Sequence, residues 1–246
     1  MNETINLLKS HRSIRKYKSD PIPQEYVDEI ITSAQMASSS SHVQAYSVIG
    51  VTDQEKKKEL SILSGNQTYI ADCPLFFVWC ADLYRLQVAC EMEKTEIVSG
   101  TMENFIVATA DVTLAAQNAA IAAESLGLGI VYIGGIRNQS KEVTELLQLP
   151  KLVYPVFGMC LGFPDQEPSQ RPRLQTNLIY HQEVYNTSNT TNELKIYNQI
   201  TNEYYLERTK GKVNTNWSKQ MSNKLQTASR KHLRKYLEDQ GFGFSE

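Results

Sequence analysis

Four short apolar stretches along the chain predict β-strands. They lie at residues 46–51, 75–81, 130–133 and 154–162. The second stretch, Leu-Phe-Phe-Val-Trp-Cys-Ala, is an almost unbroken apolar run, which is typical of a strand buried on both faces. We therefore expect other elements to cover this strand from both sides.

Helices are predicted before, between and after these strands, at residues 24–37, 103–126, 138–147, 194–208 and 217–237. Asp53 is placed to cap a further, charged helix that closes near Gly65. The segment 103–126 is rich in alanine and apolar on most of its sides. Such a helix is buried either in the core or in a subunit interface, and we favour the interface. The segment 217–237 is amphipathic and basic.

Composition indicates a soluble globular protein. The chain has 246 residues, enough for one large or two small domains, with 41% hydrophobic and 21% charged residues. A net charge of -2 argues against a general nucleic-acid-binding protein, although basic residues dominate from Arg208 to Lys235. We expect no signal peptide, no membrane span and a cytoplasmic location. The four cysteines show no metal-binding spacing and are expected to be reduced.

Two arginine-containing segments are suited to bind anions, because the guanidinium fork matches phosphate. In the segment 11–15 (His-Arg-Ser-Ile-Arg), an extended backbone would point Arg12 and Arg15 in different directions. One could then hold a phosphate while the other reaches the far end of the same ligand. In the segment 171–173 (Arg-Pro-Arg), proline favours an extended backbone, so both side chains can converge on one anion. The ordinary alternatives are a solvated basic turn and a surface loop.

Two other segments offer polar groups to a ligand. The four serines at 38–41 are either donors or a plain linker. Gly134-Gly135 follows a predicted strand and lets backbone amides approach a flat ligand closely. It is not a dinucleotide fingerprint, because that motif opens a helix after a strand. His42, His181 and His232 are expected to be structural or on the surface.

Taken together and in this order, these segments resemble the nitroreductase family. The set also contains Gly65-Asn66-Gln67, Ala116-Gln117-Asn118 and residues 132–138. The likeness covers nearly the whole chain and is greatest to the larger branch of bacterial NADPH-dependent flavin reductases and oxygen-insensitive nitroreductases. It implies an α+β fold with a central mixed sheet flanked by helices, and an intertwined homodimer with one FMN per subunit. It further implies an FMN-binding core at residues 1–186 and a C-terminal helical extension at 187–246.

The resemblance implies an oxidoreductase that takes hydride from NADPH and passes electrons to flavins, nitroaromatics or quinones in a ping-pong sequence. Arg12 would bind the FMN phosphate with His11 and Ser13 beside it, and Arg171 and Arg173 would form a second phosphate clamp. Arg15 would lie at the pyrimidine edge of the flavin ring as a fixed cation that stabilises developing negative charge. The remaining implied contacts are Gln67, Tyr132, Ile133, Gly134 and Gly135 to the ring, Ser39 and Ser40 from the partner subunit, and Arg208 to the 2′-phosphate of NADPH.

Two features leave the function open. Relatives often carry further arginines at the positions of Val213 and Asn214, where this chain instead offers the nearby Lys210 and Lys212, so the strength of the preference for NADPH over NADH is not fixed. Two other classes also remain: a family member that binds flavin with little turnover, and a basic-tailed protein whose C-terminal helices bind nucleic acid or a partner. The sequence does not name the physiological electron acceptor.

Overall fold

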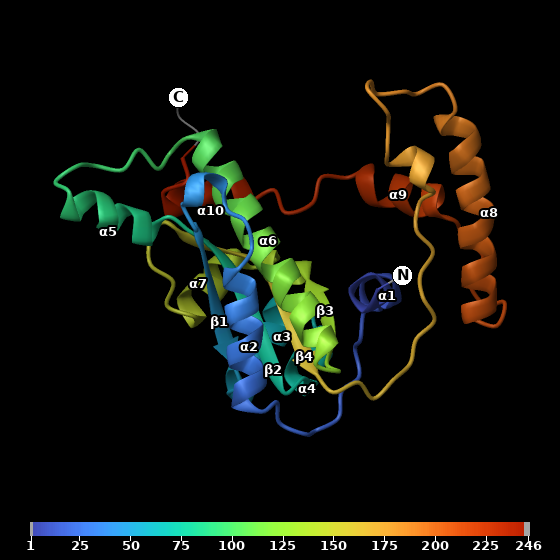
Figure 1. Ribbon diagram of the computed structural model, residues 1–246, viewed down its shortest axis with the longest axis horizontal. Helices are drawn as coiled ribbons and strands as arrows, with labels where there is room; N and C mark the ends of the chain where they lie inside the picture. The colour runs from blue at the N-terminus through green and yellow to red at the C-terminus, as the bar shows by residue number, and fades with distance from the viewer. Residues whose placement is uncertain (1, 244–246) are drawn as a thin grey trace. The chain divides into compact units, whose positions relative to one another are not determined.

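A four-stranded sheet lies at the centre of the larger part of the protein in the computed structural model, which describes residues 2–243 (Figure 1). Its strands are β1 (Tyr46–Val51), β2 (Leu75–Asp82), β3 (Gly129–Ile133) and β4 (Val153–Gly162), in the order β1-β2-β4-β3. Each predicted strand is confirmed to within one residue at either end.

Helices and short 3-10 turns connect and follow these strands. The helices are α1 (Glu3–Ser10), α2 (Gln24–Gln35), α3 (Gln54–Leu63), α4 (Tyr69–Asp72), α5 (Tyr84–Met92), α6 (Met102–Ser125), α7 (Ser140–Leu146), α8 (Thr190–Arg208), α9 (Trp217–Leu225) and α10 (Leu233–Gln240). The 3-10 turns are η1 (Ser40–His42), η2 (Gly134–Arg137) and η3 (Thr176–Leu178). Asp53 caps α3 as predicted, because its side chain accepts a hydrogen bond from the Lys56 N–H at 2.8 Å.

The strand β2 is buried on both faces, as its apolar run predicted. Successive side chains of a strand point to opposite faces of the sheet, so β2 supplies two cores. Phe77 and Trp79 pack in the core formed with α2 and α6, whereas Phe76 and Val78 pack in the core formed with α3, α4 and α7. Burial of each large apolar side chain contributes about 1.5–3 kcal/mol, so β2 ties both helix layers to the sheet.

The α+β fold is confirmed, but the sheet of the single chain is antiparallel rather than mixed. In the described part of the chain, β1 pairs with β2, β2 with β4, and β3 with β4, all antiparallel. The strands β2 and β3 do run in the same direction after a connection that contains α5 and α6. They are not neighbours, however, because β4 lies between them. The parallel pair that a mixed sheet requires is therefore not formed between these four strands.

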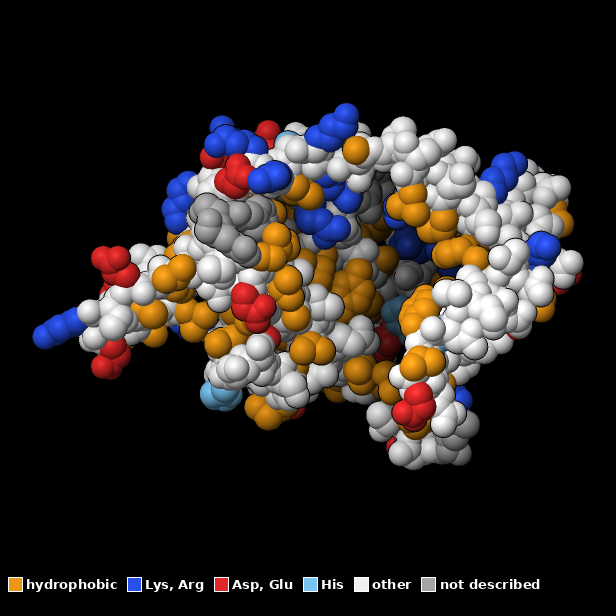
Figure 2. Space-filling model, turned by 90° about the horizontal axis from the view of Figure 1, so that it is seen from above, with side chains coloured by type: hydrophobic (Ala, Val, Ile, Leu, Met, Phe, Trp, Pro, Cys, Tyr) orange, Lys and Arg blue, Asp and Glu red, His pale blue; other side chains and the backbone are white. Residues whose placement is uncertain are grey.

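The long helix α6 is a core helix along one side. Its alanines at 108, 115, 116, 119, 120 and 123 are buried and pack with α2 and the sheet. Ile106 and Leu114 on its other side remain 53% and 48% exposed, and Figure 2 shows such hydrophobic side chains at the surface among polar ones. Among the described residues α6 alone is long and apolar enough to cross a membrane by length and composition, a test that core helices also pass.

The chain forms two compact units. One comprises Met1–Pro168 together with Arg230–Glu246, and the other comprises Ser169–Ser229. The single helix predicted at 217–237 is wrong: the structure has α9 in the smaller unit and α10 in the larger one. The break has a local cause, because Thr227 and Ser229 are weak helix formers and Arg230 adopts a left-handed φ of 50°. The predicted boundary at residue 186 stays a prediction.

We expect the substitution Gly158→Ala to destabilise the fold. Gly158 lies on β4, and an added Cβ would overlap the ring of Phe76, which is fully buried and has no space to move. Overpacking of this kind costs about 1–3 kcal/mol, which urea unfolding would measure as a lower free energy of unfolding. Gly50→Ala on β1 is the control, because its nearest neighbour is Phe77 at an ordinary 3.5 Å; it should change stability by less than about 0.5 kcal/mol. Equal losses in the two variants would contradict this account of the packing.

Candidate functional site

The segment 11–15 is fixed against the sheet through its one apolar residue. The Ile14 side chain is buried, and its N–H donates to the Ile130 carbonyl on β3 at 2.8 Å. Gly129 allows this approach, because a Cβ at that position would overlap the Ile14 side chain. The polar neighbours of Ile14 therefore have defined positions beside β3.

Two carboxylates face the cations of this segment. The His11 Nδ1 lies 2.6 Å from the Glu124 Oε1 at the end of α6, and the Arg12 Nη1 lies 3.1 Å from the Glu167 Oε1. These residues line a hollow of about 390 Å³ together with Gly127 and other residues. Sequence reasoning missed both glutamates, because their partners lie 113 and 155 residues away along the chain. The basic residues of this segment are thus paired with carboxylates of the same chain.

A second cluster joins three segments that are distant in sequence. Arg15 lies over the ring of Tyr69, with 6.0 Å from its Cζ to the ring centroid. The Tyr69 hydroxyl donates to the Gln67 Oε1, and the Gln67 Nε2 donates to the Ser64 carbonyl at 2.7 Å. A Cβ at Gly135 would overlap both the Gln67 amide and the Ser64 carbonyl. The structure thus brings Arg15, Gln67 and Gly135 together, and Tyr69, which the sequence did not single out, touches the first two.

The segment after β3 contributes mainly backbone to this region. The Tyr132 hydroxyl donates to the Ala116 carbonyl at 2.8 Å, and its ring meets Phe157 edge-on at 5.2 Å. Burial raises the pKa of the Tyr132 hydroxyl, and the charge of Glu124 raises it further. The Ile133 side chain is buried in the core, so only the backbone of Ile133 is left to meet a ligand. Gly134 then offers a backbone without a side chain.

Arg137 and Arg230 form a cationic pair that the predicted site residues did not include. The Arg137 Nη1 donates to the Val156 carbonyl, and the Arg230 Nε donates to the Asn138 Oδ1 at 2.9 Å. Burial lowers the pKa of the Arg137 guanidinium, and the neighbouring charge of Arg230 lowers it further. The His232 Nε2 donates to the Arg137 carbonyl at 3.2 Å. This histidine therefore has a structural contact.

The serine segment lies between α2 and β1. Ser39 precedes the 3-10 turn η1, which begins at Ser40. The Ser40 N–H donates to the buried Asp111 on α6 at 2.9 Å. In the part of the chain that the structure describes, no hydrogen bond or ion pair joins Ser39 or Ser40 to the segment 11–15 or to Gln67.

The arginines of the smaller unit gather near one tyrosine. Arg171 and Arg173 line a hollow of about 400 Å³ that also contains Tyr204 and Trp217. The Arg208 Nη1 donates to the Tyr204 hydroxyl at 2.7 Å, and its guanidinium lies 5.8 Å from the ring centroid.

The pKa of Tyr204 responds to the positive charge around it. Burial alone would raise the pKa of Tyr204, but hydrogen bonds with Ser169 and Arg208 and the charges of Arg208 and Arg171 outweigh it, so the pKa is lowered. Lys210 and Gly211 follow in a turn with φ of 52° and 80°. The smaller unit therefore has a basic, aromatic hollow suited to an anionic ligand.

The residues of the larger unit fit a flat, anionic cofactor. Arg12 offers an exchangeable cation, since its partner Glu167 is 87% exposed. Arg15 offers a second cation with no ion pair among the described residues, and Gly134 offers half-buried backbone without a side chain of its own. Among the described residues no group of three or more His, Cys, Asp or Glu side chains is placed to hold a metal ion.

Comparisons with known proteins agree with this geometry. The family pattern described as "Nitroreductase family" matches residues 8–163, and "Nitroreductase family, C-terminal domain" matches residues 171–245. The chain is 47% identical over 247 residues to "FMN reductase (NADPH)" of Bacillus subtilis, covering 98% of this chain and 99% of the relative. It is 40% identical over 243 residues to "Oxygen-insensitive NADPH nitroreductase" of Salmonella typhimurium, covering 98% and 99%. The solved structure of B. megaterium NfrA2 superposes with a TM-score of 0.97 at 41% identity and full coverage of both chains. The chain belongs to the nitroreductase family.

Proposed function

We propose that the protein is an NADPH-dependent, FMN-containing oxidoreductase that reduces flavins, nitroaromatics or quinones in the cytoplasm. The relatives named as FMN reductase and as NADPH nitroreductase support this assignment. The observation that carries it is the convergence of Arg15, Gln67 and Gly135 around Tyr69. A cation and an amide beside the glycine backbone of residues 134–135 fit one edge and one face of a flavin ring.

The proposed roles at the ring follow from charge and hydrogen bonding. FMN, when bound, supplies a ring that accepts hydride from NADPH and releases the electrons to an acceptor. Arg15 is a fixed cation that stabilises negative charge as it develops on the pyrimidine side. Gln67 is locked by Tyr69 and by the Ser64 carbonyl, so one of its two amide hydrogens remains for the ring. The chain itself needs no acid or base for a hydride transfer.

The other proposed contacts hold the cofactor in place. Arg12, with His11 and Ser13 beside it, is the proposed phosphate ligand of the larger unit. Arg171 and Arg173 are the proposed phosphate-binding cations of the smaller unit. The backbone of Tyr132, Ile133, Gly134 and Gly135 runs along the ring. Ser39 and Ser40 reach the cofactor of the partner subunit. In support, neither serine hydroxyl has a hydrogen bond within the described residues, so both are free to donate.

The donor site is proposed at Arg208. NADPH differs from NADH by a 2′-phosphate, which a guanidinium binds well. Arg208 is held in place by Tyr204 through a hydrogen bond and a ring contact, so its geometry is prepared before the donor arrives. Lys210 and Lys212 in the following turn add positive charge near it.

The proposed assembly is a homodimer in which α6 contributes to the subunit contact. Ile106 and Leu114 on α6 are exposed in the single chain. A subunit contact that buried these two side chains would be favourable. We retain the proposed division into an FMN-binding core at 1–186 and a C-terminal extension at 187–246.

The purified protein should be a yellow dimer. Sedimentation should give about twice the mass of one chain, and the flavin released by heat should be FMN at one per chain. Anaerobic addition of NADPH should bleach the yellow colour, because the donor reduces the bound flavin. A colourless protein would refute the proposed function. A yellow protein that NADPH leaves unbleached would instead identify a flavin-binding member without turnover.

Arg15→Ala should slow flavin reduction while leaving the fold intact. Loss of a preorganised charge beside developing charge costs about 2–4 kcal/mol in activation free energy, which stopped-flow reduction at saturating NADPH would measure. Tyr69→Phe keeps the ring under Arg15 but frees the Gln67 amide, so it should slow reduction less. Lys16→Ala removes a neighbouring exposed cation and should have no effect. An unchanged rate in Arg15→Ala would place this residue elsewhere.

Arg208→Ala should raise KM for NADPH and leave kcat nearly unchanged, because the 2′-phosphate is remote from the reacting carbon and contributes uniform binding. The expected loss is about 1.5–3 kcal/mol, as for a charged hydrogen-bonded contact. Activity with NADH and the FMN content should stay the same. Tyr204→Phe removes only the hydroxyl that holds Arg208 and should give a smaller rise in KM. Proportional losses with NADPH and NADH would mean that Arg208 does not bind the 2′-phosphate.

A further inference from the structure

The loop between α2 and β1 has a costly backbone conformation. Ser41, His42 and Gln44 have φ values of 45°, 60° and 52°, all in the left-handed region and none at a glycine. Residues with side chains persist there only when their surroundings hold them. This loop also carries Ser39 and Ser40. The strained residues lie next to two proposed cofactor contacts. Another group must therefore hold the loop in this conformation.

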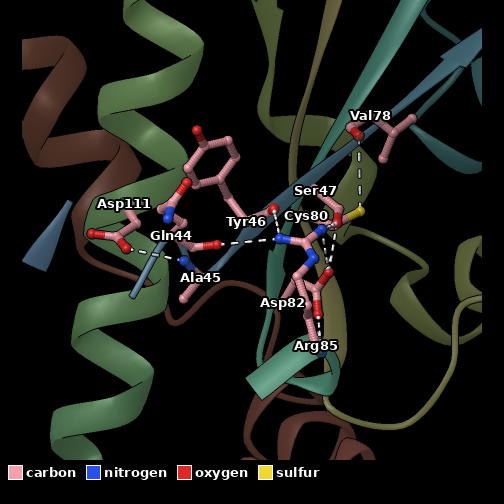
Figure 3. A network of polar contacts seen from close by, with 9 residues as sticks. All are labelled: Gln44, Ala45, Tyr46, Ser47, Val78, Cys80, Asp82, Arg85 and Asp111. Carbon is pink, nitrogen blue, oxygen red and sulfur yellow. Dashed lines mark hydrogen bonds and ion pairs between the residues drawn. The ribbon is translucent and has the colours of Figure 1, made fainter. Parts of the chain in front are cut away.

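Asp111 on α6 is that group. Its Oδ1 accepts the Ser40 N–H at 2.9 Å and its Oδ2 accepts the Ala45 N–H at 3.1 Å. The second contact is visible in Figure 3, where the carboxylate reaches from the helix to Ala45. The two N–H donors lie on either side of the left-handed residues. One carboxylate therefore holds both ends of the strained stretch.

The carboxylate has no other partner that explains its burial. Asp111 is 1% exposed, and no ion pair to it exists among the described residues. A buried carboxylate is costly unless hydrogen bonds satisfy it, and here the two loop N–H groups do so. An apolar residue at this position would leave the N–H groups of Ser40 and Ala45 without this acceptor. The contribution of Asp111 to the structure is thus the conformation of the loop.

A second contact holds the β1 end of the loop from the solvent side. Arg85 donates from Nη1 to the Gln44 carbonyl at 3.4 Å and to the Tyr46 carbonyl at 3.3 Å, and from Nη2 to the Ser47 hydroxyl at 2.9 Å (Figure 3). Asp82, which is 6% exposed, lies 3.5 Å from the Arg85 Nη2. This network fixes the start of the strand but does not reach Ser40. Asp111 is left as the group that sets the serine segment.

We propose that Asp111 is a positioning residue of the FMN site: its carboxylate holds the serine loop in the conformation that presents the hydroxyls of Ser39 and Ser40 to the cofactor. The inference rests on the proposed function and adds a residue that touches neither FMN nor substrate. Preorganisation of this kind strengthens binding because the ordering of the loop is complete before the ligand arrives.

Asp111→Asn tests the proposal. An asparagine keeps one acceptor oxygen but turns an amide donor towards a backbone N–H, which loses its partner. Holoenzyme is stripped of FMN, and FMN is titrated back while its fluorescence is followed. We expect the dissociation constant to rise at least tenfold, or about 1.4 kcal/mol. The matched control is Asp82→Asn, a buried carboxylate of the Arg85 network, which does not reach Ser40; it should change the dissociation constant by less than twofold.

A double-mutant cycle separates positioning from simple loss of stability. Ser39→Ala with Ser40→Ala should weaken FMN binding, and adding Asp111→Asn to that pair should then cost little more, because the hydroxyls it positioned are gone. A purely structural role predicts additive losses. Additivity, or serine replacement without any effect on FMN affinity, would overturn the proposal. So would equal effects of Asp111→Asn and Asp82→Asn.

A glycine variant keeps the test decisive if Asp111→Asn folds poorly. Glycine adopts left-handed φ without steric cost, so His42→Gly and Gln44→Gly in the Asp111→Asn background should restore thermal stability. Without the Asp111 carboxylate the loop is still not held in one conformation, so FMN affinity should remain low. Recovery of affinity together with stability would overturn the proposal. Wild-type protein that takes up no FMN would refute the proposed function itself, whereas wild-type FMN affinity in Asp111→Asn would refute the role of Asp111 alone.

Discussion

The burial of β2 on both faces is the constraint on which the rest of the larger unit depends. Its side chains alternate between the core with α2 and α6 and the core with α3, α4 and α7. A slip of one residue would exchange Phe76 and Phe77 between these cores, so the register is strongly fixed. Because β4 pairs with β2 and β3 pairs with β4, the position of the segment after β3 follows from the same register.

The candidate site is assembled on this frame by close backbone approaches. Gly129 lets Ile14 pack directly on β3, which sets the segment 11–15. Gly135 lets the Gln67 amide pack on η2, which sets the turn between α3 and α4. Glycine is required at both points for lack of space rather than for a special φ. Because Gly129 and Gly135 have no side chains, three segments that are distant in sequence can lie close together.

The sequence predicted what depends on local patterns. All four strands appeared as apolar runs, and Asp53 appeared as a cap, because these signals need only neighbouring residues. The continuous helix at 217–237 was wrong because its period continued across a break that Arg230 makes with a left-handed φ. The mixed sheet was wrong for this chain because strand adjacency is set by tertiary packing. The segments carrying the proposed site residues were recognised as a set, through their order along the chain.

The residues that sequence analysis missed share one physical property. Tyr69, Asp111, Glu124 and Glu167 each act on a partner that is distant in the sequence or on a backbone group, and neither relation leaves a periodic or motif signal. Asp111 sits among alanines at a position that periodicity assigns to the core, where a carboxylate reads as an exception. Such an exception is itself a signal: a charge on a core-facing position must have a buried partner.

The two carboxylates beside the segment 11–15 differ in how easily an anion could replace them. Glu124 is 13% exposed and pairs with His11 in a partly buried contact, whereas Glu167 is 87% exposed. An exposed pair is worth at most about 1 kcal/mol, so a phosphate bound at the proposed site would displace Glu167 from Arg12 at little cost. A phosphate carries more charge than one carboxylate and accepts bidentate hydrogen bonds from a guanidinium. At the proposed site the exchange would therefore favour the phosphate, while the Glu124–His11 contact would still hold the segment in place.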